Sequence, residues 1–117
     1  MISQLNPVDF LQWQTHASAT GLPVMLDVRE SWELEIASIA PDGFTLVHIP
    51  MQSIPAQLAR LQSTYAADQP IACLCHHGIR SQQVASYLAH NGFTDVVNLQ
   101  GGIAAWSTQV DSNVAQY

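Results

Sequence analysis

The sequence has 117 residues, of which 48% are hydrophobic, and carries a formal net charge of −6 at pH 7 without a single lysine. A chain of this length forms one small domain (residues 1–117), and its apolar content can fill a core without disulfides or a structural metal. The absence of lysine excludes Schiff-base chemistry and the phosphate grip of a P-loop. Because three arginines face nine acids, we expect no nucleic-acid partner and no binding to anionic membranes.

Cysteine usage and hydropathy indicate where the protein works. Cys73 and Cys75 lie one residue apart, a spacing that does not suit a structural disulfide and favours a reducing compartment. No cationic segment followed by an apolar run opens the chain, and no stretch approaches the roughly 20 apolar residues that span a bilayer. We therefore expect a cytoplasmic protein without a membrane partner.

The predicted elements alternate between helices and short apolar strands. In the first half, Asn6 and Pro7 predict the start of a helix that ends near Gly21. A strand over 24–28, a brief helix from Ser31, a turn over 41–43 and a strand over 45–49 follow. In the second half we expect a helix opened by Pro55, a strand over 71–74, a helix over 81–91, a strand over 96–99, a last helix after Gly101 and Gly102, and a surface tail.

This alternation predicts an α/β fold with an open, mainly parallel sheet and helices on both faces. The crossovers should be right-handed. Ligands bind to such sheets just beyond the carboxyl ends of the strands. The segments that follow residues 28, 49, 74 and 99 are therefore where a functional site is expected.

One of these segments, residues 75–81, joins a buried strand to a helix. A tight loop that enters a helix N-terminus points backbone N–H groups inward and forms an anion nest, which the helix dipole reinforces. We expect Cys75 to be held there as a nucleophilic thiolate. Gly78 lets the backbone turn without a Cβ penalty, and Arg80 supplies a permanent charge for an anionic substrate or leaving group.

Several motifs together resemble the rhodanese family of thiosulfate sulfurtransferases. They are LDVRE (26–30), HIP (48–50), CHHGIRS (75–81), NGF (91–93) and LQGGIAAW (99–106), and they run from about Pro23 to the C-terminus. The resemblance implies a rhodanese-like, five-stranded parallel sheet with an extra edge strand near residues 2–4. It also implies that Cys75 carries a transferable sulfur as a persulfide.

The chemistry that follows is a ping-pong sulfur transfer. Cys75 attacks the outer sulfur of a small, thiosulfate-like anionic donor, sulfite leaves, and a thiol, cyanide or protein acceptor then takes the sulfur. Arg80 orients the sulfonate end of the donor, while the loop amides stabilise negative charge. No metal and no organic cofactor is expected. The residues expected to line the substrate belong to the same loop: His76, His77, Gly78, Ile79 and Ser81.

Loop length distinguishes this chemistry from that of cysteine-dependent phosphatases and arsenate reductases. Those enzymes place five residues between cysteine and arginine, whereas four residues, 76–79, stand here. The tighter ring suits a single sulfur atom better than a tetrahedral oxyanion. Oxyanion chemistry at Cys75 therefore remains a less favoured alternative hypothesis. A zinc or redox site is disfavoured because Cys73 and Cys75 are closer than the usual pair of zinc ligands.

The link between residues 36 and 45 departs from the family pattern. Many members carry a Gly-His-Ile-Pro-Gly-Ala segment, but here Ser-Ile-Ala-Pro stands at 38–41 and His-Ile-Pro arrives only at 48–50. We therefore expect a rearranged path for this link. The departure also leaves open an alternative function, that of a non-catalytic module that keeps the fold and presents its loop to a partner protein.

Five residues in or near the loop complete the expectations. Asp27 ends a strand and is expected either to support the loop or to cap a turn. Arg29 is expected either to support the loop as well or to pair with Glu30 or Glu33 on the surface. Cys73 is assigned to the core by strand alternation. His76 and His77 would surround the sulfur with two titratable rings, so activity should vary between about pH 5 and 8.

Overall fold

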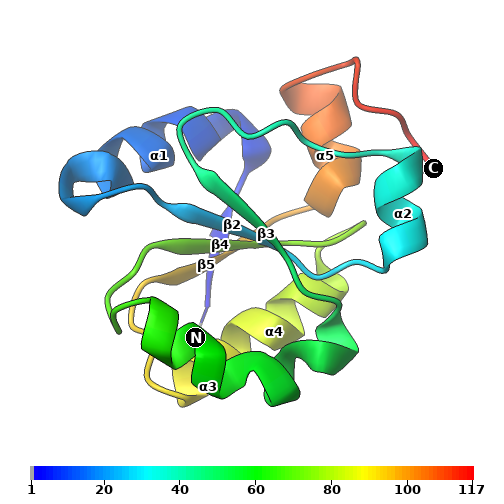
Figure 1. Cartoon of the computed structure of the whole chain (residues 1–117). Coiled ribbons are helices and arrows are strands. Elements are labelled where there is room, and N and C mark those ends of the chain that lie inside the picture. The colour runs from blue at the N-terminus through cyan, green and yellow to red at the C-terminus, as the bar shows by residue number, and fades with distance from the viewer. Residues whose placement is uncertain (1) are drawn as a thin grey trace.

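The computed structural model describes residues 2–117. In chain order its elements are β1 (Ser3–Leu5), η1 (Pro7–Asp9), α1 (Phe10–Ala17), η2 (Ser18–Thr20), β2 (Val24–Asp27), α2 (Ser31–Ile36), β3 (Thr45–His48), η3 (Met51–Ser53), α3 (Ile54–Thr64), β4 (Ile71–Leu74), α4 (Ile79–His90), β5 (Val96–Leu99) and α5 (Gly102–Gln109), where η marks a short 3₁₀ helix. Figure 1 shows the strands between two layers of helices.

The five strands form one sheet in the order β1-β5-β4-β2-β3, and every neighbouring pair is parallel. The predicted α/β class and the predicted strand at the N-terminal edge are both confirmed. The central strands β2 and β4 are buried at every residue, because helices cover both of their faces. The edge strand β3 is only partly buried.

Each face of the sheet has its own hydrophobic core. Side chains such as Leu26, Cys73 and Cys75 pack with α3 and α4 on one face. Residues such as Met25 and Leu74 point to the other face, where they pack with α1 and α5. The alternation of side chains along β2 and β4 produces this division, and Figure 1 shows the two helical layers it requires.

The link over 37–44 lies across the α1 face of the sheet. It contains no helix or strand, yet its apolar residues Ala37, Ile39 and Phe44 are buried in the core of that face. The Phe44 ring contacts Phe10 of α1 edge-on, with ring centroids 5.4 Å apart. Packing, and not backbone pairing, therefore fixes the path of the segment that departs from the family motif.

The segment after α5 is mostly a surface tail, as expected, but one of its residues is anchored in the core. Residues 110–113, 115 and 116 are exposed, whereas Val114 is only 7% exposed and belongs to the core of the α1 and α5 face. The hydroxyl of Ser107 donates to the carbonyl of Val114 at 2.6 Å and holds the segment against α5. Figure 1 shows the C-terminal end beside α2, close to the carboxyl end of the sheet.

None of the helices in residues 2–117 has the length and apolar character that a membrane span requires.

Candidate active site

Cys75 lies directly after β4, at the bottom of the loop that enters α4. Its Sγ accepts hydrogen bonds from the N–H of Gly78 at 3.0 Å and from the N–H of Ser81 at 3.4 Å, and the Ser81 hydroxyl lies 3.2 Å away. Gly78 has a φ of 97°, which favours glycine, and a Cβ there would lie 3.1 Å from the backbone nitrogen of Gly101. The predicted inward-facing amides are present, and Cys75 itself is 1% exposed.

The loop rests on Asn98, a buried polar residue in the middle of β5. Its side-chain N–H groups donate to the Gly78 carbonyl at 3.0 Å and to Gln4 at 2.9 Å, so its Oδ1 faces Ser81. The Ser81 hydroxyl lies 2.6 Å from that oxygen. Because a hydroxyl has a single proton, Ser81 donates either to Asn98 or to the sulfur of Cys75, and the choice can follow the charge of the sulfur.

The start of α5 holds the other side of Cys75. The N–H of Ile103 donates to the Cys75 carbonyl at 2.9 Å, and the N–H of Ala104 donates to the His76 carbonyl at 3.1 Å. A Cβ at Gly102 would lie 2.4 Å from each of these carbonyl oxygens, so only glycine permits this approach. The N-termini of two helices thus meet at one cysteine, α4 at its sulfur and α5 at its carbonyl.

Arg80 is held by Glu33, a buried residue of α2. The two outer nitrogens of the guanidinium donate to the two carboxylate oxygens at 2.7 and 2.9 Å. The Arg80 hydrogen bonds lower the pKa of Glu33 to about 2, and the same contact raises the pKa of Arg80. Arg80 therefore has a fixed position, and its side chain is still 32% exposed beside the loop.

Of the two expectations for Arg29, the one of a surface pair with Glu30 or Glu33 is wrong. Arg29 is 0% exposed and pairs with Asp27, whose carboxylate receives the guanidinium at 2.8 Å, and neither Glu30 nor Glu33 forms a salt bridge with it. Burial lowers the pKa of Arg29, but the hydrogen bonds to Asp27 and Tyr117 outweigh that effect and raise it overall. The backbone N–H of Arg29 also donates to the Asp27 carboxylate at 3.1 Å, so the buried arginine is held at the end of β2 and not on the surface.

The two histidines of the loop stand in an aromatic stack. His76 and His77 lie with ring centroids 3.9 Å apart, and the ring of Tyr117 stacks on the other side of His76 at 3.8 Å, tilted by 7°. Burial and the proximity of His77 lower the pKa of His76, which favours the neutral ring at neutral pH. No hydrogen bond to the Cys75 sulfur from either ring is found in residues 2–117.

Ile79 and Cys73 occupy opposite environments. Ile79, expected to line the substrate, points outward and is 72% exposed, so only its backbone belongs to the loop. Cys73 is fully buried as predicted, and burial raises the pKa of its thiol.

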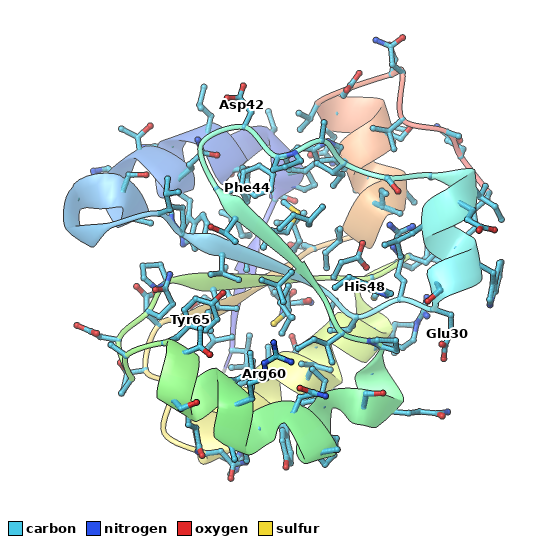
Figure 2. All side chains as sticks on the ribbon, viewed as in Figure 1. Glu30, Asp42, Phe44, His48, Arg60 and Tyr65 are labelled. Atoms are coloured by element: carbon cyan, nitrogen blue, oxygen red, sulfur yellow. The ribbon has the colours of Figure 1, made fainter. Side chains whose placement is uncertain are left out.

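A groove of about 480 Å³ lies away from the cysteine loop, between β3 and α3, and its lining includes Arg60 and Tyr65. Figure 2 shows both residues below the sheet.

Sequence reasoning missed four residues that shape the site. Asn98 could have been found, because an asparagine inside an apolar strand needs buried hydrogen-bond partners. Gly102 belongs to the LQGGIAAW motif, but the motif alone assigns it no role. Glu33 is expected from the sequence only as a partner of Arg29, and Tyr117 gives no signal, since its position depends on the path of the segment after α5.

The fold and the cysteine loop define the class of protein: a single α/β domain with a five-stranded parallel sheet and a cysteine at the carboxyl end of a central strand. Residues 10–109 match the family described as Rhodanese-like domain. The chain therefore belongs to the rhodanese-like domain family.

Its relatives include curated enzymes and solved structures. The chain is 35% identical over 92 residues to "Thiosulfate sulfurtransferase GlpE" of Pseudoalteromonas translucida, covering 76% of this chain and 88% of the relative. It is 33% identical to "Rhodanese-like/PpiC domain-containing protein 12, chloroplastic" of Arabidopsis thaliana, but spans only 40% of that protein's length. A rhodanese-like domain protein from Staphylococcus aureus has a TM-score of 0.70 at 25% identity, with 99% of each chain covered. The chain is thus homologous to rhodanese-family sulfurtransferases.

Proposed function

We propose that this protein is a sulfurtransferase that moves a sulfane sulfur from a thiosulfate-like donor to a thiophilic acceptor through a persulfide on Cys75. The observation that carries the proposal is the set of donors around the Cys75 sulfur: the N–H groups of Gly78 and Ser81 and the Ser81 hydroxyl. Donors fixed before the reaction stabilise negative charge without reorganisation. Both a thiolate and a persulfide place negative charge on sulfur at this position.

In the first step the thiolate of Cys75 attacks the outer sulfur of the donor. A new S–S bond forms to Cys75, the S–S bond of thiosulfate breaks, and its electron pair leaves with sulfite. The first N–H groups of α4 lack a carbonyl partner within the helix, so they are suited to receive the outer sulfur of the persulfide. In the second step the acceptor attacks that sulfur, and the electron pair of the S–S bond returns to Cys75.

Arg80 would bind the sulfonate end of the donor. A guanidinium has five N–H donors, of which the contacts with Glu33 use two. The remaining donors and the exposed third of the side chain can face an anion beside the loop. Glu33 fixes the direction of that charge and, at the same time, partly neutralises it.

Homology supports the same reaction class. The relative from Pseudoalteromonas translucida is named a thiosulfate sulfurtransferase. The four-residue spacing between Cys75 and Arg80 is the feature that argues against the oxyanion chemistry of cysteine-dependent phosphatases.

Intact-mass spectrometry tests the proposal. Purified protein incubated with thiosulfate should gain the mass of one sulfur atom, and cyanide should remove it with formation of thiocyanate. Cys75→Ser should show no gain, whereas Cys73→Ser, the matched control in the strand that precedes Cys75, should gain the sulfur as wild type does. A wild-type protein that gains no sulfur from several sulfane donors would contradict the proposal and favour a non-catalytic binding module.

A further inference from the structure

We propose that Tyr117 is a specificity-determining residue that narrows the entrance to Cys75 and restricts the sulfur acceptor to small nucleophiles. The inference deepens the proposed function, on which its statement about acceptors rests. Its starting point is the 1% exposure of Cys75. A sulfur so deeply placed reacts only with molecules that pass the side chains around the loop.

Tyr117 contacts the beginning of the loop through its ring. The ring lies nearly parallel to that of His76, the residue after Cys75, with centroids 3.8 Å apart. His77 continues the stack on the far side of His76. Three stacked rings therefore lie beside the residue that follows Cys75, and Tyr117 is the member that the loop itself does not supply.

Tyr117 contacts the end of the loop through its hydroxyl. The hydroxyl donates to Glu33 at 2.8 Å, and Glu33 in turn holds Arg80 with both carboxylate oxygens. Arg29 donates to the same hydroxyl at 3.1 Å. A continuous series of contacts, from His76 through Tyr117 and Glu33 to Arg80, thus connects the two ends of the loop that encloses the sulfur.

The segment that precedes Tyr117 is anchored to the core at Val114. Val114 is buried in the core, and the Ser107 hydroxyl holds its carbonyl. A ring held by a stack, two hydrogen bonds and a buried anchor does not yield to a large acceptor without losing those contacts. Cyanide or a short thiol can reach the persulfide past such a ring, whereas a tripeptide thiol or a protein thiol must displace it.

Alkylation of Cys75 with two reagents of one chemistry tests the inference without sulfur transfer. The rates are measured with iodoacetamide and with an iodoacetamide-linked fluorescein, and tandem mass spectrometry assigns the product to Cys75. Tyr117→Ala should raise the ratio of the bulky to the small rate by about tenfold, the usual scale of steric discrimination by a side chain. Tyr117→Phe keeps the ring and should leave the ratio within about twofold of wild type.

Tyr117→Trp gives the opposite test and does not depend on the folding of the alanine variant. The larger ring should lower the ratio, and circular dichroism checks that each variant is folded. An unchanged ratio in a folded Tyr117→Ala or Tyr117→Trp protein overturns the inference.

The same variants then report on the acceptor. With thiosulfate as donor, Tyr117→Ala should raise kcat/KM for glutathione relative to cyanide. The ratio cancels any common effect of the variant on Arg80 or His76. If alkylation responds to size but no persulfide ever forms, the proposed function fails while the role of Tyr117 at the entrance stands; if persulfide forms and the glutathione-to-cyanide ratio does not move, the role in acceptor choice is overturned.

Discussion

Cys73, in β4, and Cys75, directly after that strand, are separated by a single residue, point to the same face of the sheet and are almost equally buried, at 0% and 1% exposure. Their surroundings differ. Cys73 lies between Leu26 of β2 and Asn98 of β5 in the strand register, where burial raises the pKa of its thiol. Cys75 has two backbone N–H groups and a hydroxyl at its sulfur. The comparison teaches that hydrogen-bond donors at the sulfur, and not exposure, distinguish the cysteine proposed as nucleophile from the one buried in the core.

Removing each thiol in turn should give the largest difference between the two cysteines. Cys75→Ala should lower thiosulfate-dependent thiocyanate formation by roughly 10⁴-fold or more, the usual scale for loss of a nucleophile. Cys73→Ala should leave kcat within a few-fold of wild type and lower the free energy of unfolding by about 1 kcal/mol, because it leaves a small cavity. Steady-state kinetics and urea unfolding measure the two effects, and equal kinetic losses would contradict the comparison.

A second test moves Cys75 without touching its side chain. In Gly102→Ala the new Cβ would lie 2.4 Å from the carbonyl oxygens of Cys75 and His76, so the loop or α5 must shift. We expect kcat/KM to fall by about 10²-fold, since small displacements of reacting groups are costly. Gly92→Ala is the matched control, because its φ is also positive but no atom lies within 4 Å of the added Cβ. It should lower stability alone; a similar kinetic loss in both variants would refute the positioning role of Gly102.

A third test removes one hydrogen-bond donor, the Ser81 hydroxyl, from the Cys75 sulfur. Ser81→Ala deletes the hydroxyl that lies between the Cys75 sulfur and Asn98, while the backbone N–H of residue 81 remains. We expect the rate of persulfide formation to fall by about tenfold, which corresponds to one hydrogen bond to a charged group. Ser86→Ala, later in the same helix, is the control. Stopped-flow measurement of sulfite release gives the rate, and an unchanged rate would show that the backbone donors suffice.

The smallest expected effect concerns the ion pair beside the loop. Because Arg80 lowers the pKa of Glu33 from 4.5 to about 2, the ionised carboxylate stabilises the folded state above pH 4.5, and this contribution is lost as the pH falls towards 2. Arg80 is 32% exposed, so solvent screens the pair and we expect about 1 kcal/mol. Glu33→Gln should remove this part of the acid destabilisation in urea unfolding at several pH values. Glu35→Gln, on the exposed side of α2, should not.

The sheet could be predicted from the sequence because its signal is local. The central strands β2 and β4 are short, largely apolar runs, VMLD and IACL, and such runs indicate burial on both faces of a sheet. The conformation of the cysteine loop could be predicted as well, because a cysteine after a strand and a glycine at the helix start leave few conformations for the backbone between them. Its inward amides follow from that geometry.

The contacts that complete the site depend on distant segments and could not be predicted. Nothing near Arg29 in the sequence says that its side chain turns inward to Asp27. The position of Tyr117 depends on the burial of Val114, which only the assembled core defines. Side-chain partners chosen by tertiary packing are therefore the part of the site that a single sequence leaves open.

The pairing of β1 with β5 has a consequence for the order in which the molecule is built. Of the five strands, β1 is synthesised first and its partner β5 last, and Gln4 and Asn98, which share a hydrogen bond, are 94 positions apart. Contacts of such sequence separation form late, because the loop between them must first be closed. Since Asn98 also supports the cysteine loop from below, we expect a nascent chain to acquire a competent sulfur site only after β5 has been synthesised and the first strand has docked against it.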